Sequence, residues 1–553
     1  MKAGRALAAL LQRGWAAAPH PSQQQPGALR QLQRGLSGGP FAGRAGGAAA
    51  AAPWLAAVAA GLAGGVGLQL YSSTDPAQCR AADKPAASGK GAKEFDKEEV
   101  AKHRTKETGI WVTYKDGVYD VTKFVEQHPG GAARLMLAAG GAIDPFWAMY
   151  QQHNNDQVKG MLEEYRIGRL KGGAAAPVAD PYANEPARLP ALIVRSQKPM
   201  NSETPKELLV GSLITPNELF YVRNHLPVPH VDAATYRLRV EGEGVRTMEL
   251  SLEELQTRFR RHSVTATLQC TGNRRNDFNL TQRPVKGLEW DGGSISTAVW
   301  SGVRLRDVLL AAGLEDDNPD VAHIQFEGLD TDMASQCYGA SVEVDKAMDP
   351  QGDVLLAFEM KGAPLPADHG YPVRVVVPGV AGCRSVKWLG KIVASDQESA
   401  SFWQRKDYKA FSPSVDWHNV DWESAPAIQN MPVTSHICEP LSGAAIDDDE
   451  VTVKGYAWSG GGQGIIRVDV SADGGATWHT AELNKVPQKR GRGWAWALWE
   501  ATVPLPKGAK GAVQLVAKAT DESYNTQPEQ AAPIWNLRGV NCNSWHRVSV
   551  NVQ

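Results

Sequence analysis

The sequence predicts a multidomain α+β protein that ends in an immunoglobulin-like β-sandwich, and three observations lead to this fold class. At 553 residues the chain is too long for one hydrophobic core. A stretch rich in Gly, Ala and Pro at residues 171–190 predicts a flexible linker after a small domain. From about residue 430, short segments of alternating apolar and polar residues are separated by turns, which is typical of a β-sandwich.

The charge of the chain is unevenly distributed. The formal net charge is only -2, but the first 74 residues hold six of the 58 basic residues and no acidic one. Without them, 52 basic residues remain against 60 acidic ones. An acidic mature protein favours a basic protein partner over nucleic acid. We therefore expect a soluble mature protein that binds no nucleic acid.

Residues 1–74 have the composition of a presequence. They contain Arg, Ser and Gln but no acidic residue, as organelle transit peptides do. The uncharged run at 45–74 is long enough to span a bilayer, although its many Ala and Gly residues make it weakly hydrophobic. A basic presequence followed by such an uncharged run resembles the bipartite signals that sort proteins to the mitochondrial intermembrane space. The alternatives are a structureless Ala- and Gly-rich tail and a retained membrane anchor.

The six cysteines show no metal-binding or disulfide pattern. None stands in a CxxC spacing, which argues against structural zinc and iron–sulfur clusters. Cys270, however, precedes a glycine turn and two arginines, Arg274 and Arg275. A thiolate can bind a soft metal, and neighbouring guanidinium groups can hold an oxyanion. The segment 268–275 therefore suggests a metal centre for a small anion, with most metal ligands supplied by something other than protein thiols.

Residues 94–170 predict a small haem domain. Strands are expected at 110–114 and 118–121, and His128 is followed by Pro and two Gly, which place its imidazole on a loop. A second histidine, His153, follows 25 residues later. Two facing imidazoles would occupy both axial positions of a haem and leave an electron carrier. The segment 112–167 resembles cytochrome b5, which implies haem b held by His128 and His153.

The region 191–425 predicts a mixed α+β domain with long loops. It combines strands such as 373–377 with amphipathic helical stretches such as 305–310. Residues 220–417 resemble the molybdenum domain of the sulfite oxidase family. This resemblance implies that Cys270 is the single protein ligand of molybdenum in a molybdopterin cofactor. It further implies these cofactor contacts: Tyr221, Val222, Arg223, Asn224, His225, Asp330, His369, Arg374, Ser385, Val386 and Lys387.

A substrate pocket is implied by the same resemblance. Its expected residues are Arg223, Arg275, Arg538, Trp290 and Tyr408. Guanidinium groups that converge on one cavity repel one another, and buried like charges are costly. A bound dianion removes that cost, so such a cluster is an anion site. Trp290 stands twenty residues after Cys270, one more than we expect from animal relatives, so its placement is the least fixed.

Assimilatory nitrate reductases share the cysteine segment and are the main alternative. Arg538 lies in 533–540, a segment similar to sulfite oxidases and without a matching arginine in nitrate reductases. Nitrate reductases also place the haem domain after the molybdenum and dimerisation domains and add a flavin and nicotinamide domain. Here the haem domain comes first, and no GxGxxG site follows. A non-catalytic haem-binding dimer is the second alternative.

The resemblance implies an enzyme that oxidises sulfite to sulfate at a molybdenum–pterin centre. Electrons would pass through the b-type haem to cytochrome c, unless oxygen serves as the acceptor. The sandwich at 430–553, with later strands expected at 465–471, 477–480, 495–503 and 513–518, resembles the family's dimerisation domain, which implies a homodimer.

Overall fold

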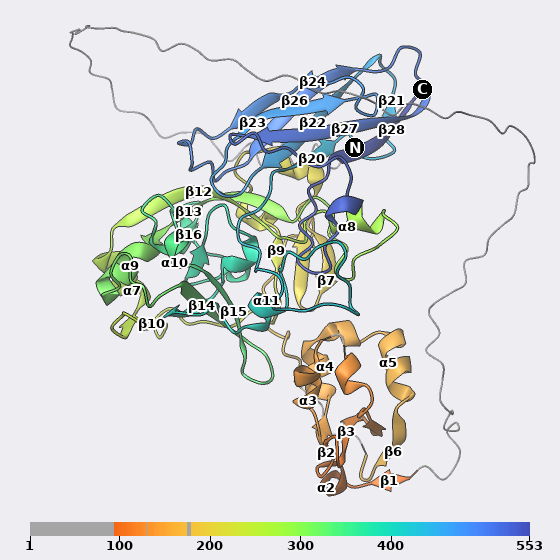
Figure 1. The fold of residues 1–553 in the computed structure, drawn as a ribbon, viewed down its shortest axis with the longest axis vertical. Coiled ribbons are helices and arrows are strands. Elements are labelled where there is room, and N and C mark those ends of the chain that lie inside the picture. Colours follow the sequence, from red (N-terminus) through yellow and green to blue (C-terminus); the bar gives the residue numbers. More distant parts are fainter. Residues whose placement is uncertain (1–92, 129, 174–178) are drawn as a thin grey trace, which may run out of the picture. The chain divides into compact units, whose positions relative to one another are not determined.

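The computed structural model describes residues 93–128, 130–173 and 179–553 (Figure 1). The expected presequence at 1–74, its apolar run, Cys79 and Pro129 lie outside the described residues. Within the described ranges, no helix is long and apolar enough to cross a membrane.

The small N-terminal domain is a sheet covered by short helices (Figure 1). Its strands run in the order β1-β6-β4-β3-β2, and β5 pairs with β3. The expected strands at 110–114 and 118–121 are β3 and β4, joined antiparallel. The strands are β1 (Glu94–Phe95), β2 (Arg104–Thr105), β3 (Gly109–Tyr114), β4 (Gly117–Asp120), β5 (Gly141–Ala142) and β6 (Arg166–Leu170). The helices are α2 (Lys97–Val100), α3 (Ala132–Met136), α4 (Asp144–Met149), α5 (Asp156–Glu163) and the 3-10 turns η1 (Val125–Gln127) and η2 (Gln151–His153).

The central domain contains two five-stranded sheets and a three-stranded sheet. One sheet has the order β11-β10-β19-β14-β15, with β10 (Leu238–Gly242), β11 (Met248–Leu250), β14 (His323–Thr331), β15 (Cys337–Glu343) and β19 (Leu389–Ser395). The next has the order β12-β13-β16-β17 with β18 on β16, from β12 (Arg261–Gln269), β13 (Ile295–Arg304), β16 (Leu355–Met360), β17 (Ala363–Pro364) and β18 (Arg374–Val376). The third joins β7 (Ile193–Gln197), β8 (Met200–Glu203) and β9 (Val222–Arg223).

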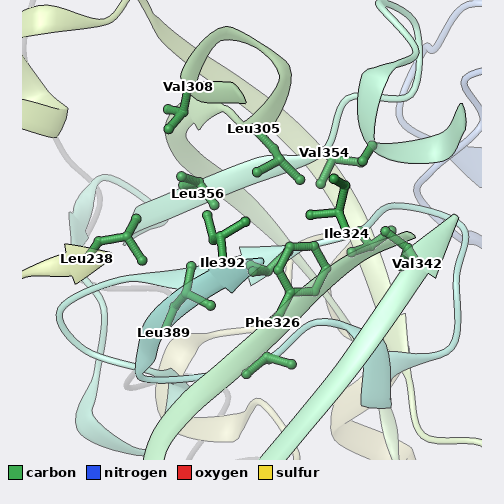
Figure 2. Packing of buried hydrophobic residues seen from close by; sticks show 14 of the residues in the cluster. Leu238, Leu305, Val308, Ile324, Phe326, Val342, Val354, Leu356, Leu389 and Ile392 are labelled. Carbon is green, nitrogen blue, oxygen red and sulfur yellow. The ribbon is translucent and has the colours of Figure 1, made fainter. Parts of the chain in front are cut away.

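Apolar side chains from both larger sheets and from helix α9 (Leu305–Ala312) meet in one core (Figure 2). Leu305, Ile324, Phe326, Leu356 and Ile392 are all fully buried there. Burying each such side chain contributes about 1.5–3 kcal/mol, so this cluster fixes the two sheets against each other.

The ends of the central helices follow local signals in the sequence. Helix α7 (Leu252–Arg258) begins at Ser251, whose hydroxyl accepts a hydrogen bond from the Glu254 amide at 3.1 Å while the Glu254 carboxylate accepts one from the Ser251 amide at 2.9 Å. Helix α9 ends at Gly313, which takes a left-handed conformation with φ of 99°. The remaining helices are α6 (Lys206–Leu209), α8 (Arg275–Asn279), α10 (Val344–Met348) and α11 (Phe402–Arg405), with 3-10 turns η3 (Asn217–Leu219), η4 (Ala367–His369) and η5 (Gly382–Arg384).

The C-terminal domain is the predicted β-sandwich. One sheet has the order β20-β22-β26-β25, from β20 (Thr434–Glu439), β22 (Glu450–Trp458), β25 (Glu482–Lys485) and β26 (Ala497–Pro504). The other has the order β21-β28-β27-β23-β24, from β21 (Ala445–Ile446), β23 (Ile465–Ser471), β24 (His479–Thr480), β27 (Gly511–Asp521) and β28 (His546–Val552), and the 3-10 turn η6 (Ala532–Ile534) precedes β28. The strand expected at 465–471 coincides with β23, whereas the strand expected at 477–480 is only the two residues of β24.

The linker differs from the expectation in its second half. Arg188 donates from Nε to the Asp368 carboxylate at 2.7 Å, and Glu185 accepts a hydrogen bond from the Val228 amide at 3.0 Å. The Arg188–Asp368 ion pair and the hydrogen bond from the Val228 amide to Glu185 hold residues 185–188 against the central domain. The composition of 171–190 did not reveal them.

Candidate active site

The two histidines of the small domain face each other with nearly parallel rings. The His128 and His153 ring centroids are 6.0 Å apart, and the ring planes differ by 13°. Iron between two imidazoles, with metal–nitrogen bonds of about 2 Å and a ring radius of about 1.1 Å, requires a centroid separation of about 6 Å. The spacing therefore fits one metal ion held between the rings.

The main chain fixes which nitrogen of each ring is free. His128 Nδ1 lies 3.1 Å from the Gly131 carbonyl oxygen, and His153 Nδ1 lies 2.8 Å from that of Tyr150. Each Nδ1–H can donate there, which leaves Nε2 as a lone-pair ligand. Burial lowers the pKa of both histidines, so both rings are neutral and able to ligate near pH 7. These residues fit an axially ligated haem.

Cys270 lies directly after β12 and faces a cavity in the central domain. Its amide donates to the Ser294 carbonyl at 3.0 Å, and its Sγ accepts a hydrogen bond from the Gly272 amide at 3.3 Å. The cavity encloses about 640 Å³ including its open mouth.

Ten of the predicted site residues line this cavity. They are Tyr221, Arg223, His225, Cys270, Asp330, His369, Arg374, Ser385, Lys387 and Tyr408. The cavity lining does not include Val222, Asn224 or Val386. These residues alternate with lining residues along extended backbone, in which successive side chains point to opposite sides. Val386 packs into the core instead, and Asn224 donates from Nδ2 to Asp368 at 3.1 Å.

The cavity lining includes two basic side chains and a carboxyl oxygen without a hydrogen-bond partner among the described residues. Lys387 donates to the Asp368 carbonyl at 2.8 Å, and burial lowers its pKa to about 7. Arg374 donates to the Ser385 carbonyl at 2.8 Å and to that of His369 at 3.2 Å. Burial raises the pKa of Asp330 to about 8, and its Oδ1 has no hydrogen-bond partner among the described residues.

Arg223, Tyr408 and His225 form a hydrogen-bonded group in the same cavity. Arg223 donates from Nη1 to the Asn224 carbonyl at 2.6 Å and from Nη2 to the Tyr408 hydroxyl at 3.4 Å. His225 Nε2 lies 2.7 Å from that hydroxyl. Burial raises the pKa of Tyr408 to about 12 and places that of His225 well below its usual value. The phenol is thus protonated and the imidazole neutral at pH 7.

Arg275 and Arg538 are partly buried near Arg223, although neither lines the cavity wall. Burial, together with the nearby charges of Arg275 and Arg223, lowers the pKa of Arg538 to about 10. Arg538 also forms an ion pair with Asp407. Arg275 donates from Nη1 to the Lys286 carbonyl at 2.8 Å, and its Nε has no partner among the described residues. Three guanidinium groups therefore share one electrostatic environment.

Trp290 lies beside the cysteine segment. It is fully buried, and a Cβ placed on Gly272 would lie 2.7 Å from its Cδ1. Only glycine permits this approach, so the indole is packed against the turn that follows Cys270.

Several residues near the site escaped the sequence-based prediction. Phe220, Leu268, Tyr338, Gly382, Cys383 and Trp388 also line the cavity. The sequence also did not reveal Asp407, the ion-pair partner of Arg538, or the role of Gly539. A Cβ on Gly539 would lie 3.0 Å from the Tyr408 Cα, so this glycine lets the Arg538 segment approach Tyr408. Gly539 also adopts a left-handed φ of 93°, which the sequence does not predict.

The residues fit a molybdenum–pterin cofactor. Within the described ranges, no group of three or more His, Cys, Asp or Glu residues could hold a metal. A metal at the Cys270 thiolate would therefore take its other ligands from a cofactor. Lys387 and Arg374 offer buried donors for a phosphate, and the Asp330 oxygen is an unused acceptor for ring N–H groups.

Three family models match the chain. The oxidoreductase molybdopterin-binding domain matches residues 225–403, the Mo-co oxidoreductase dimerisation domain matches 425–553, and the cytochrome b5-like haem/steroid-binding domain matches 96–171. These matches confirm the predicted fold class and the two predicted cofactor-binding domains.

Known proteins resemble the chain over most of its length. Sulfite oxidase of Gallus gallus is 55% identical over 82% of this chain and 99% of its own, and mitochondrial sulfite oxidase of Homo sapiens is 54% identical over 83% and 84%. The nitrate reductase [NAD(P)H] of Hordeum vulgare is 40% identical over 66% of this chain and only 42% of its own. Among solved structures, the sulfane dehydrogenase SoxCD of Paracoccus pantotrophus matches with a TM-score of 0.54 and 27% identity, over 68% of this chain and 93% of that one. The chain belongs to the sulfite oxidase family.

Proposed function

We propose that this chain is a molybdenum-dependent sulfite oxidase that converts sulfite to sulfate. The observation that carries the proposal is the grouping of three partly buried guanidinium groups, Arg223, Arg275 and Arg538, beside the Cys270 cavity. A cavity with that charge has to be filled by an anion, since each guanidinium raises the cost of burying the others.

The cofactor supplies oxygen-atom transfer and takes up two electrons when it is bound. Cys270 would hold its metal, while Lys387 and Arg374 would hold its phosphate through charge-assisted hydrogen bonds. We assign the remaining cofactor contacts to Tyr221, His225, Asp330, His369 and Ser385, which share the cavity with Cys270.

The chain's own residues bind and orient the anion. The guanidinium groups of Arg223, Arg275 and Arg538 would neutralise sulfite and hold it at the thiolate side of the cavity. The Tyr408 hydroxyl, protonated at pH 7, can donate to a sulfite oxygen. Trp290 would exclude water from the cysteine turn, against which it packs.

Sulfite oxidation releases two electrons and two protons when water supplies the new oxygen. We propose that His128 and His153 would hold a haem, which would accept the two electrons one at a time and pass them on. The acceptor would be cytochrome c, a basic protein that suits the acidic chain. We place the enzyme in mitochondria, as its human relative is named, and in the intermembrane space, where cytochrome c is found.

The test is an anaerobic sulfite titration of the full-length protein with the haem spectrum as readout. Sulfite should reduce the haem, and the Cys270→Ser variant should keep its haem but lose this reduction and its bound molybdenum. Haem oxidation by nitrate without any response to sulfite would favour the nitrate reductase alternative. Full turnover by Cys270→Ser would exclude the proposed metal site.

A further inference from the structure

Two consecutive arginines in the cysteine segment point to different domains. Arg275 begins helix α8 and lies near the anion site, whereas Arg274 is fully buried on the side of the β-sandwich. The divergence arises at Arg274 itself, which adopts φ of 63° and ψ of 26°, the left-handed region. That conformation is unfavourable for a residue with a side chain, so surrounding contacts must hold it.

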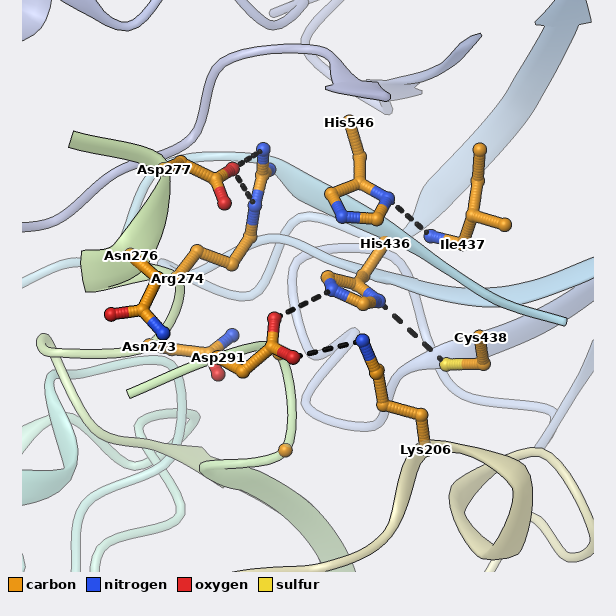
Figure 3. Close-up of polar contacts among 12 residues, drawn as sticks. Lys206, Asn273, Arg274, Asn276, Asp277, Asp291, His436, Ile437, Cys438 and His546 are labelled. Atoms are coloured by element: carbon orange, nitrogen blue, oxygen red, sulfur yellow. Dashed lines mark hydrogen bonds and ion pairs between the residues drawn. The ribbon is translucent and has the colours of Figure 1, made fainter. Parts of the chain in front are cut away.

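The contacts that hold Arg274 come from the sandwich and from Asp277 of helix α8. Its Nη1 donates to the Ser435 carbonyl in β20 at 3.0 Å, and its Nη2 donates to the Trp545 carbonyl at 3.4 Å. Asp277 accepts from its Nε at 2.9 Å, as Figure 3 shows. The fully buried Arg274 guanidinium thus donates hydrogen bonds to the C-terminal domain and to one carboxylate of its own helix.

Asn273, the residue before, is held by a tyrosine of the sandwich. Its Nδ2 donates to the hydroxyl of Tyr456 in β22 at 2.9 Å, and its Oδ1 accepts from the Ser294 amide at 3.1 Å. The Tyr456 hydroxyl in turn donates to the Gly292 carbonyl at 2.9 Å. One buried oxygen atom therefore joins the turn after Cys270 to the loop after Trp290.

The Trp290 loop has a second attachment to the sandwich. Asp291 accepts from Lys206 at 2.8 Å, and its other oxygen lies 3.8 Å from Nε2 of His436, a buried residue of β20 (Figure 3). The His436 ring stacks on that of His546 at 3.7 Å. The Arg274 amide donates to the Asp291 carbonyl at 2.6 Å, which closes the connection between the two loops.

Within the segment itself, few bonds fix the distance between the thiol and the guanidinium. The Asn273 amide donates to the Cys270 carbonyl at 2.9 Å and the Arg275 amide to that of Gly272 at 3.0 Å. Asn273 and Arg274 stand between Cys270 and Arg275, so whatever holds them sets where both functional groups lie. A displacement of about 1 Å can cost a catalytic site up to about 100-fold in rate.

We propose that the β-sandwich positions the active site through Tyr456, whose hydroxyl orients the turn between Cys270 and Arg275. Tyr456 is a positioning residue and touches neither substrate nor cofactor. The proposal rests on the proposed function for its kinetic part, and it extends the role of the C-terminal domain from dimerisation to the chemistry of the central domain.

The test compares Tyr456→Phe with a matched control, Tyr236→Phe. Tyr236 is also buried, and its hydroxyl donates to the Leu389 carbonyl at 2.6 Å, within the main core and apart from the Cys270 segment. Each change removes one buried hydroxyl and its hydrogen bonds, so both variants should lose thermal stability. Only Tyr456→Phe should raise the KM for sulfite and lower kcat/KM, by about 3- to 10-fold, with ferricyanide as acceptor.

A second readout does not depend on sulfite chemistry. In full-length protein produced without molybdenum cofactor, the iodoacetamide alkylation rate of Cys270, followed by peptide mass spectrometry, should change at least about threefold in Tyr456→Phe. Cys383, in the same cavity, serves as the internal reference, and its rate should change much less. If wild-type protein fails to oxidise sulfite but the Cys270 alkylation rate still changes in Tyr456→Phe, the positioning role is supported and the proposed function is wrong.

Equal kinetics and equal Cys270 alkylation in both variants and wild type would overturn the proposal, whatever happens to stability. If Tyr456→Phe does not fold, Arg274→Lys replaces it, because lysine keeps the charge but cannot reach the Ser435 and Trp545 carbonyls together. The same two readouts then decide, with Tyr236→Phe as the control.

Discussion

The ion pair between Arg538 and Asp407 gives a prediction whose magnitude follows from the structure. Asp407→Asn keeps the shape of the side chain and one oxygen toward Arg538 but removes the negative charge. An anion bound on the far edge of the Arg538 guanidinium would lie roughly 7 Å from that carboxylate. At an effective dielectric constant between 20 and 80, one such pair of unit charges repels by about 0.6–2.4 kcal/mol.

Because Arg538 is 30% exposed, the lower half of that range applies. For a dianion the repulsion doubles to about 1.2–3 kcal/mol, which corresponds to a factor of about 8 to 160. Asp407→Asn should therefore tighten sulfate binding by that factor, measured as the inhibition constant against sulfite with ferricyanide as acceptor. The gain should shrink in 0.5 M salt (about a 4 Å screening length), because screening weakens interactions across partly exposed groups.

The control is Asp353→Asn. Asp353 is buried and accepts hydrogen bonds from Arg492 Nε at 2.6 Å and from Trp494 Nε1 at 2.8 Å, and it does not line the Cys270 cavity. This variant should lose stability but leave sulfate inhibition unchanged. Unchanged or weaker sulfate inhibition in Asp407→Asn would refute the placement of Arg538 at the anion.

Three further predictions follow from the same contacts. His153→Ala should lose the haem spectrum and the reduction of cytochrome c, while ferricyanide reduction by sulfite persists, as measured in parallel assays. Burial raises the pKa of Glu203 to about 7, above its unfolded value of 4.5, so ionisation of this residue lowers stability as pH rises through that interval. Urea unfolding should show the wild type losing about 3 kcal/mol relative to Glu203→Gln between pH 4.5 and 7.5, and parallel curves would contradict this. Deleting five residues within 172–178 should slow haem reduction by sulfite in stopped-flow measurements without changing ferricyanide reduction, and equal slowing of both would point to a misfolded domain instead.

The sequence predicted best those features that depend on local pattern. Strand β23 coincides with the expected strand because alternating apolar residues define both its faces and its ends. His128 and His153 were identified as a pair because a Pro-Gly-Gly turn and strand pattern accompany them. In the predicted cofactor run 221–225, only every second residue lines the cavity, because Tyr221, Arg223 and His225 face it while the residues between them do not.

Features that depend on long-range contacts could not be predicted. The partner of Arg538 is Asp407, 131 residues away, and composition carries no sign of that pairing. Arg274 and Arg275 look equivalent in the sequence, yet one left-handed residue sends their side chains to different domains. The linker likewise looked uniform, although Glu185 and Arg188 find partners on the central domain.

The charge left over at the site favours a dianion over nitrate. Arg538 is paired with Asp407, but within the described residues no carboxylate lies within 4 Å of Arg223 or Arg275, whose hydrogen bonds go to neutral oxygens. About two positive charges therefore lack a fixed counter-charge inside the protein. A dianion such as sulfite or sulfate neutralises both, whereas nitrate leaves one partly buried guanidinium uncompensated, at a cost. Sulfate should accordingly compete with sulfite far better than nitrate does at equal ionic strength, and comparable inhibition by the two anions would show that shape, not charge, sets the selectivity of this pocket.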